Sequence, residues 1–269
     1  MTIQELCKRI NLQENVAERV IEFISSYDFS DLEATLQDLI QPETAKSAYE
    51  KLLTTFPEDE DKIKLLSCYL IGASRVYEKY QEKGISDEIF TETFECFTRF
   101  IEECKEKTGK YAFDRAFWTW RQASMLLFRI GELEYELVNE NGKKEISVHI
   151  PSDAGMSDEV IDSSLKAAQE FFDTYYPEYA ECDYVCDSWM LSPKLKELLN
   201  EESNIIRFQN RFEIREENKE AKDIFEWVFK ANEDADIETL PENTSLQRKA
   251  KALLLKGDNI GIAVGVMKR

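Results

Sequence analysis

The chain of 269 residues is longer than a usual single domain, so two domains are expected, and its 43% hydrophobic content is enough for packed cores. Acidic residues outnumber basic ones by 54 to 34, which gives a formal net charge of -20. Such a charge repels phosphate backbones and anionic lipid surfaces, so nucleic acids and membranes are excluded as expected partners. A cationic or amine-bearing partner fits the sign of the charge.

No targeting or metal-binding signal is found in the sequence. The first residues, "MTIQELCKRINLQENVAERV", lack an apolar core, and no run of 18 apolar residues occurs, so we expect a cytoplasmic protein. The six cysteines are scattered without CxxC spacing, and there is one histidine. We therefore expect buried free thiols and no metal site.

The first 107 residues have the apolar periodicity of helices. Val16, Val20, Ile21 and Ile24 lie on one stripe of "ENVAERVIEFISSY". Helices are also predicted within residues 42–56, 60–84 and 86–107, which carry capping residues at their ends. We place a domain boundary near residue 110, after Gly109, which gives a helical domain of residues 1–110 and a second domain of residues 111–269. Residues 116–128, "AFWTWRQASMLLF", are expected to form a helix or a helix-to-strand junction.

Beyond Phe128 the period changes to two, which is typical of strands. "RIGELEYELVNENGKKEISVHI" alternates on both sides of Asn141 and Gly142, and this dipeptide favours a two-residue hairpin turn. The turn fixes the register, because Glu140 must then pair with Lys143.

The register gives each strand of the hairpin an apolar face and a polar face. Leu137, Tyr135 and Leu133 would meet Ile146, Val148 and Ile150 on the apolar face. On the polar face, Glu134 would lie opposite His149, and Glu132 and Glu136 would share that face. The single histidine thereby acquires a carboxylate neighbour.

The rest of the chain is predicted to alternate helices and strands. A long helix should follow "SDAGMS" and end before Pro177, and "SPKLKELL" and "TSLQRKAKALLLKGD" read as two further helices. The predicted strands are "CDYVCDSWMLS", "NIIRFQNRFEIRE", "DIFEWVFK" and "NIGIAVGVMKR". The fold class is α+β: an all-helical N-terminal domain followed by a mixed sheet flanked by helices.

Several strings resemble bacterial acyltransferases that join a helical N-acyltransferase N-terminal domain to a C-terminal domain like that of the GCN5-related N-acetyltransferases (GNAT). They are "WRQASMLLFRIGELEYEL", "VHIPSDAGMS", "YPEYAECDYVCDSWMLSPKLKELL", "SNIIRFQNRF" and "LPENTSLQRKAKALLLKG". The resemblance implies transfer of an acyl group from acyl-CoA or acetyl-CoA, as co-substrate, to an amine of a small-molecule acceptor. The superfamily's pyrophosphate-binding string, Q/R-x-x-G-x-G/A, is absent here.

Within this resemblance, Glu134 and His149 are the candidate catalytic residues, because an attacking amine must lose a proton to a positioned base. An ordinary cross-strand polar pair is the alternative explanation for them. Glu132 and Glu136 are candidates for an acidic wall around the acceptor, or else part of a solvated sheet face. Trp189 and Arg121 complete the candidate acceptor site, with core packing and interdomain packing as their alternatives.

Two predicted helix starts could hold the phosphates of CoA, because free N–H groups and the helix dipole favour anions there. The first offers Ser192 and Lys194, and the second offers Ser245, Gln247 and Arg248. Ordinary capping and a solvated helix face are the alternatives.

Two further functions stay open from the sequence. A ligand-binding or regulatory module on the same scaffold, without transfer chemistry, is favoured by the missing glycine-rich string. A partner-binding protein that uses its helical half would instead require a large apolar surface there.

Overall fold

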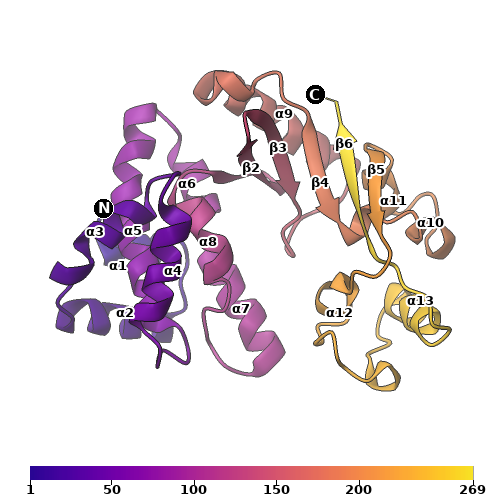
Figure 1. The fold of residues 1–269 in the computed structure, drawn as a ribbon, viewed down its shortest axis with the longest axis horizontal. Coiled ribbons are helices and arrows are strands. Elements are labelled where there is room, and N and C mark those ends of the chain that lie inside the picture. Colours follow the sequence, from indigo (N-terminus) through magenta and orange to yellow (C-terminus); the bar gives the residue numbers. More distant parts are fainter. Residues whose placement is uncertain (269) are drawn as a thin grey trace. The chain divides into compact units, whose positions relative to one another are not determined.

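The computed structural model describes residues 1–268, which form two compact units that divide between Ile130 and Gly131. In Figure 1 the first unit runs from indigo to magenta and contains helices, and the second runs to yellow and contains the sheet. The predicted fold class, a helical N-terminal part followed by a mixed sheet with helices, is confirmed.

The first unit is built around the long helix α5 (Ile63–Lys83), most of whose apolar side chains are buried. Its other elements are α1 (Ile3–Arg9), α2 (Glu14–Ser26), η1 (Ser30–Leu32), α3 (Glu33–Leu39), α4 (Ala45–Thr55), α6 (Asp87–Phe94), α7 (Cys96–Thr108), α8 (Ala116–Ala123) and the strand β1 (Leu127–Ile130). Helices α1, α2, α3, α4, α6 and α8 all contact α5. Buried rings of Tyr69, Phe97 and Phe113 pack edge to face in this core, a favourable ring geometry.

Helix α8 explains why the compact units divide later than residue 110. It packs against α4 and α5, and its residues Thr119, Gln122 and Ala123 are buried. Residues 116–128 form a helix followed by the start of a strand, as expected. Their apolar side chains pack in the helical core, so they belong to the first compact unit. The sequence places the boundary earlier, near residue 110, because the composition changes there.

The second unit contains a mixed sheet in which five strands follow the order β2-β3-β4-β6-β5. Their bounds are β2 (Leu133–Glu140), β3 (Lys143–His149), β4 (Tyr184–Ser188), β5 (Glu213–Asn218) and β6 (Ile262–Met267). Strands β3 and β4 are parallel, and the other neighbouring pairs among these five are antiparallel. Helix α9 (Asp158–Tyr175) and the turn η2 (Pro177–Tyr179) connect β3 to β4.

One face of the sheet packs on α9. Tyr135 of β2 contacts the ring of Phe172 on this helix, and its hydroxyl lies 2.9 Å from Ser164 Oγ. Tyr184 of β4 joins the same aromatic cluster. This is the apolar hairpin face that the sequence predicts.

A second apolar cluster lies among short helices near one end of the sheet. Its elements are η3 (Trp189–Leu191), α10 (Leu195–Leu198), α11 (Asn204–Gln209), α12 (Asp223–Trp227), η4 (Ile237–Thr239) and α13 (Ser245–Leu254). Leu195, Ile206, Phe225 and Leu254 are among its buried members. Figure 1 shows α12 and α13 below the strands β4, β5 and β6.

Three of the predicted strands are wrong in part or in full. The strand predicted for residues 182–192 ends at Ser188, and Trp189–Leu191 form η3. Residues 204–209 form α11 because Ser203 accepts a hydrogen bond from Ile206 N at 3.3 Å and caps the helix; the strand begins only at Glu213. Residues 223–227 form α12, whose Ile224 and Phe225 enter the apolar cluster. The apolar residues of that segment recur at spacings of three and four, which indicates a helix. The strand was predicted because the segment is rich in residue types that favour strands.

Gly265 of β6 gives a test of how tightly the sheet packs against Leu191 and Phe212. A Cβ atom there would lie 2.8 Å from Leu191 Cδ1 and 2.8 Å from Phe212 Cβ. We expect Gly265→Ala to lower the free energy of unfolding by about 1–3 kcal/mol, because an added methyl group overpacks the site. Urea unfolding measures this. Val264→Ile, on the half-exposed opposite face of the same strand, should change stability little; equal effects of the two substitutions would contradict the packing.

Candidate active site

The register of the β2–β3 hairpin is the predicted one. Glu140 pairs with Lys143, and Glu134 lies directly opposite His149. The turn residues Asn141 and Gly142 have φ values of 53° and 86°, in the left-handed region that this dipeptide tolerates. The sequence therefore placed the histidine beside its carboxylates correctly.

The carboxylate hydrogen bonded to His149 Nε2 is that of Glu136, whereas the sequence pointed to Glu134. His149 Nε2 lies 2.9 Å from Glu136 Oε2, and both side chains are largely buried. Glu136 is the diagonal neighbour of His149 on the same face, and diagonal neighbours are within reach of a long side chain. Glu134, directly opposite, is 3% exposed, which is rare for a carboxylate.

Strand β4 adds a third carboxylate to this face. Ser147 pairs with Val185, and the residues two positions further along the parallel strands are His149 and Asp187. Asp187 pairs with Val264 of β6, and Val264 pairs in turn with Glu216 of β5. The side chains of Asp187 and Glu216 therefore lie on the same face of the sheet as His149. We call Glu134, Glu136, His149, Asp187 and Glu216 the acidic face.

The charges of the acidic face act on one another. Partial burial and then the charge of Asp223 on α12 raise the pKa of Asp187, while His149 opposes this shift and Glu216 reinforces it. Partial burial also raises the pKa of Asp223, as do Glu233 and Glu226. Within residues 1–268, Asp187, Glu216 and Asp223 form no ion pair with lysine or arginine. Asp187 and Glu216 are exposed, so water and the neighbouring His149 offset part of the repulsion among these carboxylates.

The other residues predicted for an acceptor site make contacts with residues other than the His149–Glu136 pair. Glu132 accepts a hydrogen bond from Gly155 N at 2.6 Å, in the loop between β3 and α9. Trp189 is half-buried on η3 against the apolar cluster of short helices. Arg121 belongs to α8 of the helical unit, where its guanidinium lies 4.4 Å from the ring centroids of both Trp118 and Trp120.

The two predicted CoA-binding helix starts use their polar groups within the chain. Ser192 is buried and donates to Ile260 O at 2.5 Å, and Lys194 pairs with Glu197 and Asp258, each at 2.8 Å. At α13 the helix is capped by Thr244 in a capping box with Gln247, and Ser245 is its first residue. Arg248 donates to Glu242 O at 2.7 Å. Helices α10 and α13 contact each other. None of the hydrogen bonds and ion pairs just described joins them to a residue of the acidic face.

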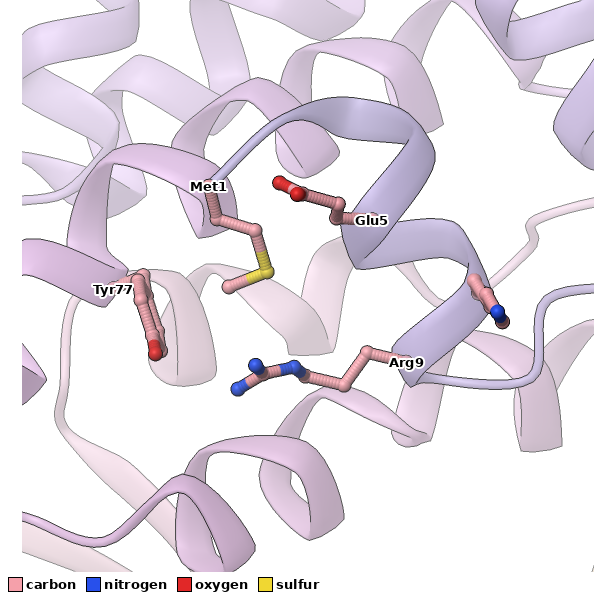
Figure 2. Close-up of a pocket in the computed structure, with 5 residues that line it drawn as sticks. Met1, Glu5, Arg9 and Tyr77 are labelled. Atoms are coloured by element: carbon pink, nitrogen blue, oxygen red, sulfur yellow. The ribbon is translucent and has the colours of Figure 1, made fainter.

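A pocket of about 530 Å³ lies in the helical unit and is lined by Met1, Glu5, Lys8, Arg9 and Tyr77. Figure 2 shows the Met1 side chain and the Arg9 guanidinium extending toward the side of Tyr77. Arg9 is held by Asp87, 3.0 Å away, which also accepts from the Tyr77 hydroxyl at 2.9 Å. None of the predicted site residues lines this pocket.

The cysteines are free thiols, as expected, and five of the six are buried. Burial raises the pKa of Cys7 to about 11 and that of Cys68 to about 12. Both groups therefore stay protonated near neutral pH, where a thiol is a poor nucleophile. Among residues 1–268 no group of three or more histidine, cysteine, aspartate or glutamate side chains could hold a metal ion, and no helix is long and apolar enough to span a membrane.

Two contacts of the site were missed from the sequence. Alternation along "YVCDS" places Asp187 on the face of Val185, but the pairing of β4 with β3 was needed to bring it beside His149. The hydrogen bond from Gly155 N to Glu132 could not be predicted from the sequence, in which the single glycine of the loop is the only indication.

Asp187 and Asp223 provide a pH-dependent test. Because their pKa values are raised in the folded state, stability falls as rising pH ionises them. We expect Asp187→Asn and Asp223→Asn each to raise the free energy of unfolding at pH 7, with the gain disappearing as the pH falls toward the ordinary pKa of aspartate. The combined gain should be smaller than the sum, because each substitution relieves the same repulsion. Urea unfolding at several pH values, with Glu217→Gln as the exposed control, measures this; strictly additive gains would contradict the coupling.

Comparison with solved structures finds acyltransferases of the same fold. One is an acyltransferase in complex with decanoyl-CoA and teicoplanin, with a TM-score of 0.79, 23% identity, and coverage of 98% of this chain and 87% of that chain. Another, in complex with CoA and 10C-teicoplanin, has a TM-score of 0.79, 24% identity and the same coverage. A third, in complex with decanoyl-CoA, has a TM-score of 0.79, 20% identity, and coverage of 98% and 86%. At these identities the likeness concerns the fold.

Family models match both parts of the chain, while a search of curated proteins finds no match. The N-acyltransferase N-terminal domain matches residues 1–125, and the GNAT-like C-terminal domain matches residues 127–267, more than half of the chain. The residues matched by the GNAT-like domain include the β2–β3 hairpin, the parallel strands β3 and β4, and helix α9. The acidic face and the loop after β3 lie within this part of the chain. The chain therefore belongs to the N-acyltransferase family with a GNAT-like C-terminal domain.

Proposed function

We propose that this protein is an acyl-CoA-dependent N-acyltransferase that modifies an amine of a small-molecule acceptor. The observation that carries the proposal is the His149–Glu136 pair on the acidic face of a GNAT-like sheet. Acyltransferases of the same fold are found in complex with decanoyl-CoA and with teicoplanin, which supports the donor class and a small-molecule acceptor.

The acyl-CoA would lie along the parallel strands β3 and β4. Their ladder contains only the pairs Ile146–Tyr184 and Ser147–Val185, although both strands continue beyond it. Backbone groups of the unpaired ends are then available to a ligand. The loop after β3 leads into α9, an 18-residue helix whose N-cap Ser157 makes no side-chain capping bond. A pyrophosphate would bind there, because helix N-termini favour anions; the residues of α10 and α13 stay candidates for the nucleotide part.

His149 would act as the general base. Glu136 fixes the ring by binding Nε2, and its carboxylate would stabilise the imidazolium once a proton is taken. The bound ammonium first gives one proton to His149, which passes it to solvent, and this frees the lone pair of the nitrogen. The amine nitrogen then attacks the thioester carbonyl carbon, and the C–N bond forms as His149 accepts the second proton. The C–S bond then breaks, and the CoA thiolate leaves and takes up the proton. The products are an amide and free CoA.

The acidic face would bind the acceptor through its positive charge. Asp187 and Glu216 form no ion pair with lysine or arginine within residues 1–268, and an ammonium group would relieve their repulsion. Glu134 lies on the same face beside His149 and would add to this field. The charge of the face thus favours an amine over a neutral alcohol as the acceptor.

A ligand-binding module without transfer chemistry is the second candidate. This candidate is favoured because the loop between β3 and α9 has one glycine in place of a glycine-rich string. The N–H of this Gly155 is also already bonded to Glu132. Such a module would bind CoA or an acceptor but would release no thiol.

Calorimetry with CoA, acetyl-CoA, octanoyl-CoA and decanoyl-CoA tests the donor. We expect saturable heat with at least one acyl-CoA and tighter binding for longer chains, because each buried methylene contributes about 0.8 kcal/mol. Absence of binding to all four compounds would remove the basis of the proposed reaction.

Substitutions at the pair test the base. We expect His149→Ala to lower kcat/KM for amine-dependent release of CoA thiol by about 10²- to 10⁴-fold, and Glu136→Gln to lower it less, since the imidazole remains. The control is Glu145→Gln, on the same face of β3 but bonded to Lys143. Thiol release can be followed with a panel of amines. Full activity of a folded His149→Ala variant would reject the assignment, and acyl-CoA binding without any thiol release in the wild type would favour the binding module.

A further inference from the structure

Glu132 holds the loop that joins the candidate base to α9. Its Oε2 accepts a hydrogen bond from Gly155 N at 2.6 Å, a short bond of the kind made by a charged acceptor. Glu132 precedes β2, and the loop follows β3, the strand that ends at His149. A carboxylate of the chain itself is therefore bound to the one glycine N–H of this loop.

The loop is shaped to let this anion approach. A Cβ atom on Gly155 would lie 3.3 Å from the Glu132 carboxyl carbon and 3.3 Å from its Oε1. A side chain at position 155 would thus crowd the carboxylate and also Val160 Cγ2, which would lie 3.3 Å away. The next residues lead to Ser157, whose side chain makes no capping bond at the start of α9. Gly155 therefore lies three residues before Asp158, the first residue of α9.

We propose that Glu132 is a built-in competitor for the pyrophosphate of acyl-CoA, seated on Gly155 N–H when the donor is absent and displaced when it binds. This inference rests on the proposed function, because it assumes that the donor's phosphates bind at the start of α9. A phosphate and a carboxylate cannot share one N–H without strong repulsion, since both are anions. Glu132 thereby lowers the affinity for CoA and sets the donor concentration at which the site fills.

The charge of Glu132 can be removed without removing its hydrogen bond. In Glu132→Gln the amide oxygen can still accept from Gly155 N, so the loop keeps its contact, but the bond is that of a neutral acceptor. We expect this variant to bind decanoyl-CoA about tenfold more tightly, because a charged hydrogen bond is replaced by a weaker neutral one that the phosphate displaces more easily.

The experiment compares two ligands by calorimetry at fixed ionic strength. Decanoyl-CoA carries the phosphates, and S-decanoyl-N-acetylcysteamine carries the same thioester without them. The matched control is Glu159→Gln, in the first turn of α9, which removes the same charge near the same helix end but has no bond to Gly155 N. Tighter binding of decanoyl-CoA by Glu132→Gln alone, with unchanged binding of the phosphate-free thioester, supports the inference.

The other outcomes separate this inference from the proposed function. If the wild type binds decanoyl-CoA and Glu132→Gln binds it equally or more weakly, Glu132 only supports the loop and the inference is overturned, while the proposed function stands. Equal gains in Glu132→Gln and Glu159→Gln would mean a general effect of charge and would also overturn it. If neither the wild type nor any variant binds decanoyl-CoA, the proposed function fails and the inference with it. Binding by Glu132→Gln but not by the wild type would support the inference.

Discussion

The two-residue turn at Asn141 and Gly142 sets the arrangement of the candidate active site. It fixes the β2–β3 register, and the register decides that Tyr135 enters the core while Glu134, Glu136 and His149 share the other face. A slip of one residue would exchange these faces, placing carboxylates against α9 and aromatic rings on the polar side. The apolar pairs and the turn favour the same register, so the position of the histidine is doubly determined.

The acidic face and the loop after β3 have opposite electrostatic requirements. In the proposed reaction a cationic amine would be stabilised by Asp187 and its neighbours, whereas the phosphates of acyl-CoA would need N–H groups and would have to avoid carboxylates. The fold would separate the two requirements along β3, because side chains of this strand belong to the acidic face, whereas the backbone of the following loop would offer its N–H groups to the phosphates. With a net charge of -20, the chain as a whole repels the anionic CoA, so backbone N–H groups and apolar contacts would have to supply most of its binding.

Long periodic segments were predicted well, and short segments near the end of the sheet were not. The hairpin, α5, α9 and α13 have either a sustained period or clear caps, so local preference and tertiary packing agree. Residues 204–209 and 223–227 are short, apolar and rich in residues that favour strands, yet they form helices because their side chains fill one cluster with α10 and α13. In such segments burial outweighs intrinsic preference.

The sequence by itself determined the helical first part, the hairpin register and the face on which His149 lies, because these depend on periodicity and on turn residues. Tertiary structure alone decided which carboxylate binds the imidazole, that Asp187 joins it from another strand, and that Glu132 is seated on Gly155. These contacts depend on the twist of the sheet, on the pairing of strands distant in sequence and on side-chain rotamers. None of those is encoded in local spacing.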